Sequence, residues 1–116
     1  MSPERRLRVG VVGLGYWGPN VARNIVNGAR TELRWACDLR SELLDVFEER
    51  FTGTQTTTRY AEMLADPELE AVAIATPVSS HYKIAVAAIE AGKHVFVEKP
   101  LTASSEEARD LIARAE

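Results

Sequence analysis

The sequence predicts an α/β protein, a doubly wound parallel sheet with helices on both faces, and three observations carry this prediction. Short apolar runs alternate with longer stretches of helical periodicity, which is the pattern of successive βαβ units. The run at residues 71–76 (AVAIAT) is apolar almost throughout, as expected for a central strand buried on both faces. A Gly-x-Gly-x-x-Gly motif at residues 13–18 separates the first apolar run from the first helical stretch.

The first strand is expected over residues 7–13 (LRVGVVG), where the apolar residues end at a glycine. A helix is expected over residues 19–27, because Val21, Ala22 and Ile25 fall on one face at helical spacing. A glycine follows this stretch and provides the stop signal. The chain therefore begins with a strand, a glycine-rich turn and a helix.

The second strand is expected over residues 33–38 (LRWACD), and Ser41 is expected to cap a helix that runs to about residue 51. The apolar residues of this helix share its inner face: Leu43, Leu44, Phe47 and Phe51. Residues 55–60 (QTTTRY) are rich in β-branched side chains and predict a short third strand at the edge of the sheet.

A brief helix is expected over residues 61–65, and the Asp66-Pro67 pair should stop it. The fourth strand is the apolar run at 71–76, and the following helix is expected over residues 80–91, closed by Gly92. This second half repeats the strand–helix alternation of the first half.

The fifth strand is expected over residues 94–99 (HVFVEK), and Ser104 with Glu107 forms a capping-box pair that opens a final helix. Crossover connections between parallel strands are right-handed. Two such units growing outward from the first strand give the strand order 3-2-1-4-5, which is the Rossmann arrangement.

Composition limits the functional classes. A chain of 116 residues is the size of one domain, and a net charge of −3 without a basic block argues against nucleic-acid binding. No apolar stretch reaches the ~20 residues that a membrane span needs. Cys37 is the single cysteine, which fits a reducing compartment, and we expect a cytoplasmic protein. One cysteine and two distant histidines predict no metal site.

The three glycines predict a dinucleotide site. Gly13 would allow a tight turn, Gly15 would let the backbone approach a pyrophosphate, and Gly18 would let the helix pack closely on the strand. Tyr16 and Trp17, between the second and third glycine, would supply backbone amides and shield the turn. The positive end of the helix dipole favours the phosphates. A glycine-rich turn without a ligand is the alternative.

An acidic residue about 20 positions further on completes this motif, and Asp38 lies there, at the end of the predicted second strand. Its carboxylate would accept hydrogen bonds from the adenosine ribose and repel a 2′-phosphate, which favours NAD. A solvated strand end or a helix cap is the alternative role. Arg40 lies two residues further on and could accommodate the phosphate of NADP. NAD is the predicted cofactor, with NADP as the alternative.

Thr76 and Pro77 end the predicted fourth strand, so both should line the same crevice at the carboxyl ends of the strands. Thr76 could instead cap the next helix.

Four motifs in order, GLGYWG, CD, ATP followed by His81, and EKP, resemble the Gfo/Idh/MocA oxidoreductase family over nearly the whole chain. The resemblance implies hydride transfer between a sugar or cyclitol carbon and the nicotinamide. It implies that Lys99 is the catalytic lysine, also in contact with the cofactor, and that Glu98 lies near the nicotinamide ribose. It places His81 near the cofactor or in support of its loop, although a purely local hydrogen bond is the alternative. The GYWGPN variant looks most like UDP-N-acetylglucosamine 3-dehydrogenases.

Family members carry a second, substrate-binding domain, and we expect these 116 residues to be the dinucleotide-binding domain of a longer oxidoreductase. That piece should bind the cofactor but be inactive alone. A free-standing dinucleotide-binding sensor or subunit is the alternative. A homo-oligomer is compatible with the sequence, and the sequence does not identify which sugar is the substrate.

Overall fold

The computed structural model describes residues 6–15, 18–97 and 105–115. Its core is a parallel sheet of five strands: β1 (Leu7–Val12), β2 (Thr31–Cys37), β3 (Gln55–Thr57), β4 (Ala71–Ile74) and β5 (His94–Val97). The strand order is β3-β2-β1-β4-β5, as the sequence predicts. The order reverses between β1 and β4, and ligands of open α/β sheets bind at such a reversal point.

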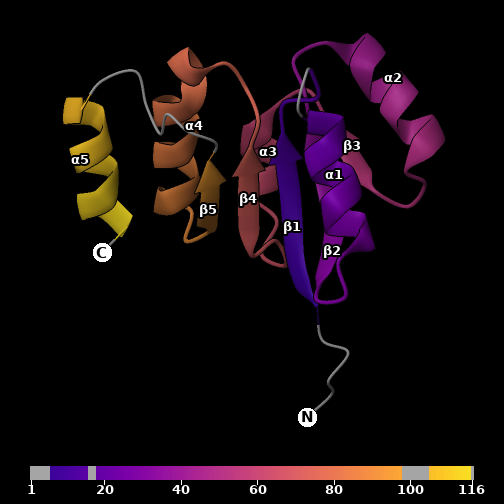
Figure 1. Cartoon of the computed structure of the whole chain (residues 1–116), viewed down its shortest axis with the longest axis horizontal. Helices are drawn as coiled ribbons and strands as arrows, with labels where there is room; N and C mark the ends of the chain where they lie inside the picture. Colours follow the sequence, from indigo (N-terminus) through magenta and orange to yellow (C-terminus); the bar gives the residue numbers. More distant parts are fainter. Residues whose placement is uncertain (1–5, 16–17, 98–104, 116) are drawn as a thin grey trace.

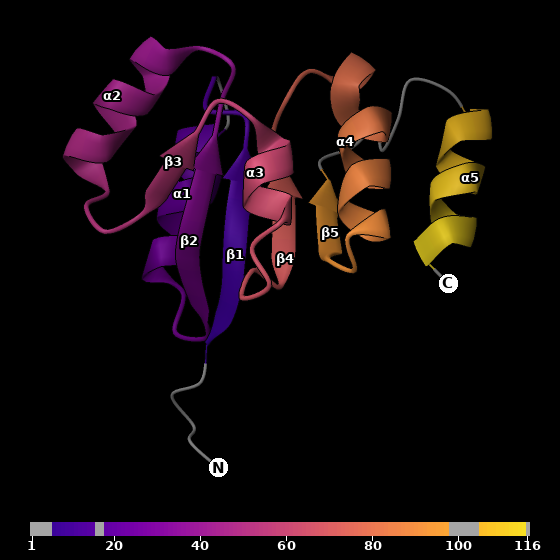
Figure 2. The ribbon, with the colours of Figure 1, turned by 180° about the vertical axis from the view of Figure 1, so that it is seen from behind.

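Helices cover both faces of the sheet (Figures 1 and 2). One face carries α1 (Gly18–Asn27) and α2 (Ser41–Arg50). The other face carries α3 (Tyr60–Leu64) and α4 (Val78–Glu90), and α5 (Ser105–Ala115) lies beside α4. The Tyr82 hydroxyl of α4 donates a hydrogen bond to Asp110 of α5 at 2.7 Å, which ties these two helices together.

Each face has its own hydrophobic core. Val9 and Val11 of β1 pack with Phe47 and the other apolar residues under α1 and α2. Val12 packs with Met63 and with residues of α4 and α5 on the opposite face. Alternate residues of a strand point to opposite faces, which explains this division of β1.

A β-bulge changes the alternation in β2. Val9 pairs with Leu33 but the next residue, Gly10, pairs with Trp35, so Arg34 is the extra residue. One extra residue moves the side chains of the following positions to the opposite face of the sheet. Trp35 and Cys37 consequently point to the α3–α4 core, whereas Leu33 points to the α1–α2 core.

Asp66, after α3, joins the bulge to the loops at the amino ends of the strands. Its Oδ2 accepts hydrogen bonds from Arg34 Nε at 2.5 Å and from Trp35 Nε1 at 2.8 Å. Its backbone carbonyl accepts a hydrogen bond from Lys93 Nζ at 2.9 Å. The bulge and the turn before β5 are therefore held by one residue.

Some boundaries differ from the expectation. Arg40, not Ser41, is the N-cap of α2, and no side chain caps that helix, so the predicted Ser41 cap is wrong. Ser41 is already helical, because the backbone turns one residue earlier. The third strand ends at Thr57, since Tyr60 starts α3. The helix α4 starts at Val78, two residues before the predicted start.

The ends of three strands are joined at the carboxyl edge of the sheet. The Gly13 N–H donates to the Cys37 carbonyl at 2.8 Å, and the Ala75 N–H donates to the Val12 carbonyl at 2.8 Å. These bonds extend the β1 pairings by one residue beyond the strand ends, so the loops that follow β1, β2 and β4 begin side by side. Within the described residues, no helix is long and apolar enough to cross a membrane.

Candidate dinucleotide-binding site

A cavity of about 770 Å³ lies at the carboxyl edge of the sheet, where the loops after β1, β2 and β4 meet. Its lining comes from all three loops and from the first turns of α4. The residues are Val12, Gly13, Gly15, Cys37, Asp38, Leu39, Arg40, Tyr60, Ala75, Thr76, Pro77, Ser80, Lys83 and Ile84. This volume falls in the range of ligand pockets in proteins.

The fold itself requires two of the three glycines. Gly13 has φ +102°, and a Cβ there would lie 2.8 Å from the Ala75 backbone carbonyl. A Cβ at Gly18 would lie 1.9 Å from the Gly13 carbonyl oxygen. A side chain at Gly13 would clash with the chain that follows β4, and one at Gly18 would force the first turn of α1 away from Gly13, so these glycines are explained by packing.

Gly15 is different, because the fold does not require it. Its φ is not positive and it is exposed. Among the described residues, a Cβ at Gly15 would meet only the Nη2 atom of Arg40, at 3.1 Å, which is the end of a flexible side chain. A glycine that neither backbone conformation nor packing demands leaves room for the close approach of a ligand to the chain.

The Asp38 carboxylate is buried at this edge, with 5% of the side chain exposed. Its Oδ2 accepts a hydrogen bond from the Leu14 N–H at 2.7 Å, and its Oδ1 accepts one from the Arg40 N–H at 2.8 Å. The Arg40 guanidinium adds Nε at 3.1 Å from Oδ1 and Nη2 at 3.3 Å from Oδ2. Asp38 is thus neither a solvated strand end nor the cap of α2; it binds the glycine-rich loop and Arg40.

Burial by itself raises the pKa of the Asp38 carboxyl, but the hydrogen bonds from Arg40 and from the Leu14 and Arg40 amides lower it by more. The net pKa of Asp38 is below its ordinary value, so the group is an anion at neutral pH. Burial raises the pKa of the neighbouring Cys37 thiol to about 12. The thiol is therefore neutral and unreactive.

Thr76 contributes a hydroxyl to the cavity wall. Its Oγ1 is buried and has no hydrogen-bond partner among the described residues. The N-cap of α4 is Pro77 and no side chain caps that helix, so the alternative role of Thr76 as a cap is wrong. Buried hydroxyls nearly always have partners, and an unpaired one beside a cavity fits a ligand.

His81 lies behind the cavity, buried in the first turn of α4. Its Nε2 is 2.8 Å from the Thr76 backbone carbonyl oxygen. His81 is not among the residues that line the cavity. Its contact with Thr76, five residues earlier, fits both the loop-supporting role that the family resemblance implies and the alternative of a purely local hydrogen bond.

The cavity brings together six of the predicted residues: Gly13, Gly15, Asp38, Arg40, Thr76 and Pro77. Gly18 is buried beneath the loop and does not line the cavity. Tyr16, Trp17, Glu98 and Lys99 lie outside the described residues.

Sequence reasoning missed several lining residues, among them Tyr60, Ser80 and Lys83. Ser80 and Lys83 are three residues apart, so they lie on the same face of α4. Tyr60 follows the third strand, whose carboxyl end must reach the same edge as the others. The end of the predicted third strand could have identified Tyr60, and the start of the helix after the fourth strand could have identified Ser80 and Lys83.

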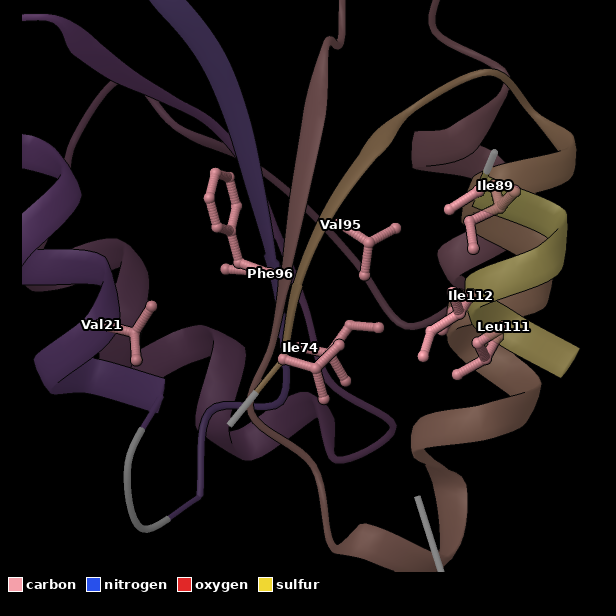
Figure 3. A pocket seen from close by; sticks show the side chains of 11 residues that line it. Val21, Ile74, Ile89, Val95, Phe96, Leu111 and Ile112 are labelled. Carbon is pink, nitrogen blue, oxygen red and sulfur yellow. The ribbon is translucent and has the colours of Figure 1, made fainter. Parts of the chain in front are cut away.

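A second hollow, of about 590 Å³, lies at the edge strand β5 and is lined by residues of α1, β4, β5, α4 and α5. Figure 3 shows its apolar side chains: Phe96 points to the α1 side of the sheet, and Val95 points toward Ile89, Leu111 and Ile112. Its lining contains no titratable residue among those that the structure describes. Within the described part of the chain, no group of three or more His, Cys, Asp or Glu residues could hold a metal ion.

Comparison with known proteins agrees with this geometry. The family described as "Oxidoreductase family, NAD-binding Rossmann fold" matches residues 7–116. The chain is 37% identical over 109 residues to a scyllo-inositol 2-dehydrogenase (NAD(+)) of Bacillus subtilis strain 168, covering 91% of this chain and 31% of that protein. It is 32% identical over 115 residues to a levoglucosan dehydrogenase of Pseudarthrobacter phenanthrenivorans, covering 90% of this chain and 29% of that protein. The chain thus spans less than a third of these curated relatives.

Two solved structures superpose closely. GenD2 from gentamicin A biosynthesis, in complex with NAD, is 40% identical with a TM-score of 0.90, covering 96% of this chain and 32% of that one. A variant of KijD10, a 3-ketoreductase from Actinomadura kijaniata in complex with TDP-benzene and NADP, is 29% identical with a TM-score of 0.87, covering 96% and 35%. The fold, the NAD-binding character and the sequence motifs all agree, and the chain belongs to the Gfo/Idh/MocA family of oxidoreductases.

Proposed function

We propose that this chain is the dinucleotide-binding domain of an oxidoreductase that transfers a hydride between a sugar-like hydroxyl carbon and a nicotinamide cofactor. The observation that carries the proposal is Gly15, a glycine that neither its φ nor its contacts with the described residues require, exposed at a cavity over the reversal point of the sheet. The Thr76 hydroxyl in the same wall, which has no hydrogen-bond partner in the described part of the chain, supports it.

The chain's residues fit a dinucleotide. Gly15 and the first amides of α1 would bind the pyrophosphate, aided by the helix dipole. Asp38 would bind the adenosine ribose, and Thr76 would donate its hydroxyl to the ligand. The bound nicotinamide would supply the hydride acceptor. Lys99, with Glu98 beside the nicotinamide ribose, would stabilise the substrate oxygen as its proton leaves.

The substrate class follows from the relatives by analogy. A scyllo-inositol 2-dehydrogenase and a levoglucosan dehydrogenase suggest a polyhydroxylated ring for this protein too. The narrower prediction, a UDP-N-acetylglucosamine 3-dehydrogenase-type sugar nucleotide, rests on the GYWGPN motif alone. Titrating candidate sugars and sugar nucleotides against a longer polypeptide containing these residues would separate the two.

We further propose that the 116 residues bind cofactor without turning over substrate, because the curated relatives are about three times as long. A free-standing dinucleotide sensor or subunit remains the second candidate. Sugar-dependent formation of NADH by these residues alone would contradict the proposal that they bind cofactor without turning over substrate. The single, buried and free Cys37 supports a reducing, cytoplasmic location.

The cofactor proposal is tested by thermal unfolding of the chain with NAD and with NADP. A ligand that binds only the folded state at ~100 Kd raises the free energy of unfolding by about 2.7 kcal/mol. Gly15→Val should abolish this shift, whereas Ala113→Val, at an exposed position of α5, should keep it. No shift with either dinucleotide in the unsubstituted chain would refute the proposal.

A further inference from the structure

The inference concerns Arg40 and rests on the proposed function. Of the four contacts at the Asp38 carboxylate, two come from fixed backbone amides, those of Leu14 and Arg40. The other two come from the Arg40 guanidinium. The carboxylate expected to accept the ribose hydroxyls is therefore already engaged by the protein.

The two kinds of donor differ in mobility. The Leu14 amide belongs to the buried loop after β1. The Arg40 side chain is 57% exposed, whereas the carboxylate beneath it is 5% exposed. Long, exposed side chains rearrange readily and their ion pairs are weak. Displacing the guanidinium is consequently the easiest way to free acceptor positions on Asp38.

The guanidinium also lies over the glycine-rich loop. Its Nη2 lies 3.1 Å from a Cβ built on Gly15, and no other described atom outside the neighbouring residues of the chain lies within 4 Å of that Cβ. Gly15, Asp38 and Arg40 line the same cavity. A dinucleotide bound at Gly15 and Asp38 would therefore lie beside the Arg40 guanidinium.

We propose that Arg40 sets the preference between NAD and NADP by competing with the adenosine ribose for Asp38. Binding of NAD replaces the two guanidinium contacts of Asp38 with ribose hydroxyl contacts, and NAD has no 2′-phosphate to pair with the displaced cation there. Binding of NADP displaces the same contacts, but the 2′-phosphate pairs with the guanidinium at the edge of the site. Arg40 thus opposes NAD and favours NADP, and it offsets the repulsion between Asp38 and the phosphate.

The test compares Arg40→Ala with the unsubstituted chain by calorimetric titration of NAD and NADP. Arg40→Ala keeps the backbone bond to Asp38, so the loop should stay folded, which circular dichroism and thermal unfolding check. We expect NAD to bind about 1.5- to 5-fold more tightly, the value of an exposed ion pair. We expect NADP to bind about 10- to 100-fold more weakly, because a charged hydrogen-bonding partner is lost. Arg50→Ala, with the same charge change at the far end of α2, should change neither.

A second pair of variants isolates the competition. In an Asp38→Asn background, adding Arg40→Ala should no longer tighten NAD, because the ion pair is already absent. If Arg40→Ala weakens NAD and NADP equally, or changes neither, this inference is overturned while the cofactor site stands. If the unsubstituted chain binds neither dinucleotide, the proposed function fails and this inference fails with it.

Discussion

The Asp38 carboxylate accepts a hydrogen bond from the Leu14 backbone N–H at 2.7 Å, so the residue expected to bind ribose also holds the glycine-rich loop. Asp38 therefore has a structural role in addition to the ribose-binding role that we propose for it. A change at Asp38 that abolishes cofactor binding is therefore ambiguous unless folding is measured as well.

We predict that Asp38→Ala lowers the free energy of unfolding by about 1 to 3 kcal/mol, because the buried Leu14 N–H loses its acceptor. Asp38→Asn should lose less, since its amide oxygen can still accept that bond. Both should weaken NAD binding, and Asp38→Asn should raise the affinity for NADP relative to NAD. Urea unfolding and calorimetric titration measure the two effects, and Asp45→Ala on the exposed side of α2 is the control. Equal stability of all three variants would contradict the structural role.

Substitution by alanine should affect folding at one glycine of the motif and cofactor binding at another. Gly18→Ala places a Cβ 1.9 Å from the Gly13 carbonyl, so we expect a loss of several kcal/mol or failure to fold. Gly15→Ala meets only the movable Arg40 side chain among the described residues, so we expect a change within about 0.5 kcal/mol. Its affinity for NAD should nevertheless fall at least tenfold. Tight NAD binding by Gly15→Ala would show that no ligand approaches this position.

A substitution at Thr76 should weaken cofactor binding without lowering the stability of the fold. Its buried hydroxyl has no partner among the described residues, so Thr76→Val should leave the free energy of unfolding unchanged or raise it by up to about 1 kcal/mol. If the hydroxyl serves the cofactor, the same variant should bind NAD more weakly. Thr76→Ser, which keeps the hydroxyl, is the matched control for binding. A Thr76→Val variant that binds as well as Thr76→Ser would remove Thr76 from the site.

Asp66 should make the fold sensitive to acid. The hydrogen bond from Arg34, and after it the one from Trp35, hold the pKa of Asp66 far below its ordinary value. A carboxyl group with a lower pKa in the folded state than in the unfolded state stabilises the folded protein. This stabilisation is complete above the unfolded-state pKa of about 4 and is lost as the pH falls toward the folded-state pKa. We expect Asp66→Asn to cost about 1 to 3 kcal/mol at pH 7 and progressively less below about pH 4.

Urea unfolding between pH 7 and pH 2 measures this dependence. Asp45→Asn, at an exposed position of α2, should show no comparable loss at pH 7. A difference between Asp66→Asn and the unsubstituted chain that stays constant over the whole range would show that the Asp66 charge is not what stabilises the loops.

The sequence by itself determined the architecture, because its signals are local. Apolar runs, helical periodicity and the three glycines predict the strand order, and the position of Asp38 follows from the motif spacing. The described strand ends that carry predicted ligand contacts, those of β1, β2 and β4, reach one edge of the sheet, since parallel strands share a direction.

Tertiary structure decided what local patterns do not encode. The bulge at Arg34 depends on how β1 and β2 pair, and it turns Trp35 toward Asp66, 31 residues away. The engagement of Asp38 by Leu14 and Arg40, and the distinction between Gly15 and Gly18, depend on distances across the folded loops. Spacing in a sequence identifies which residues reach a site, but burial and the competition for hydrogen bonds there arise only when the chain packs.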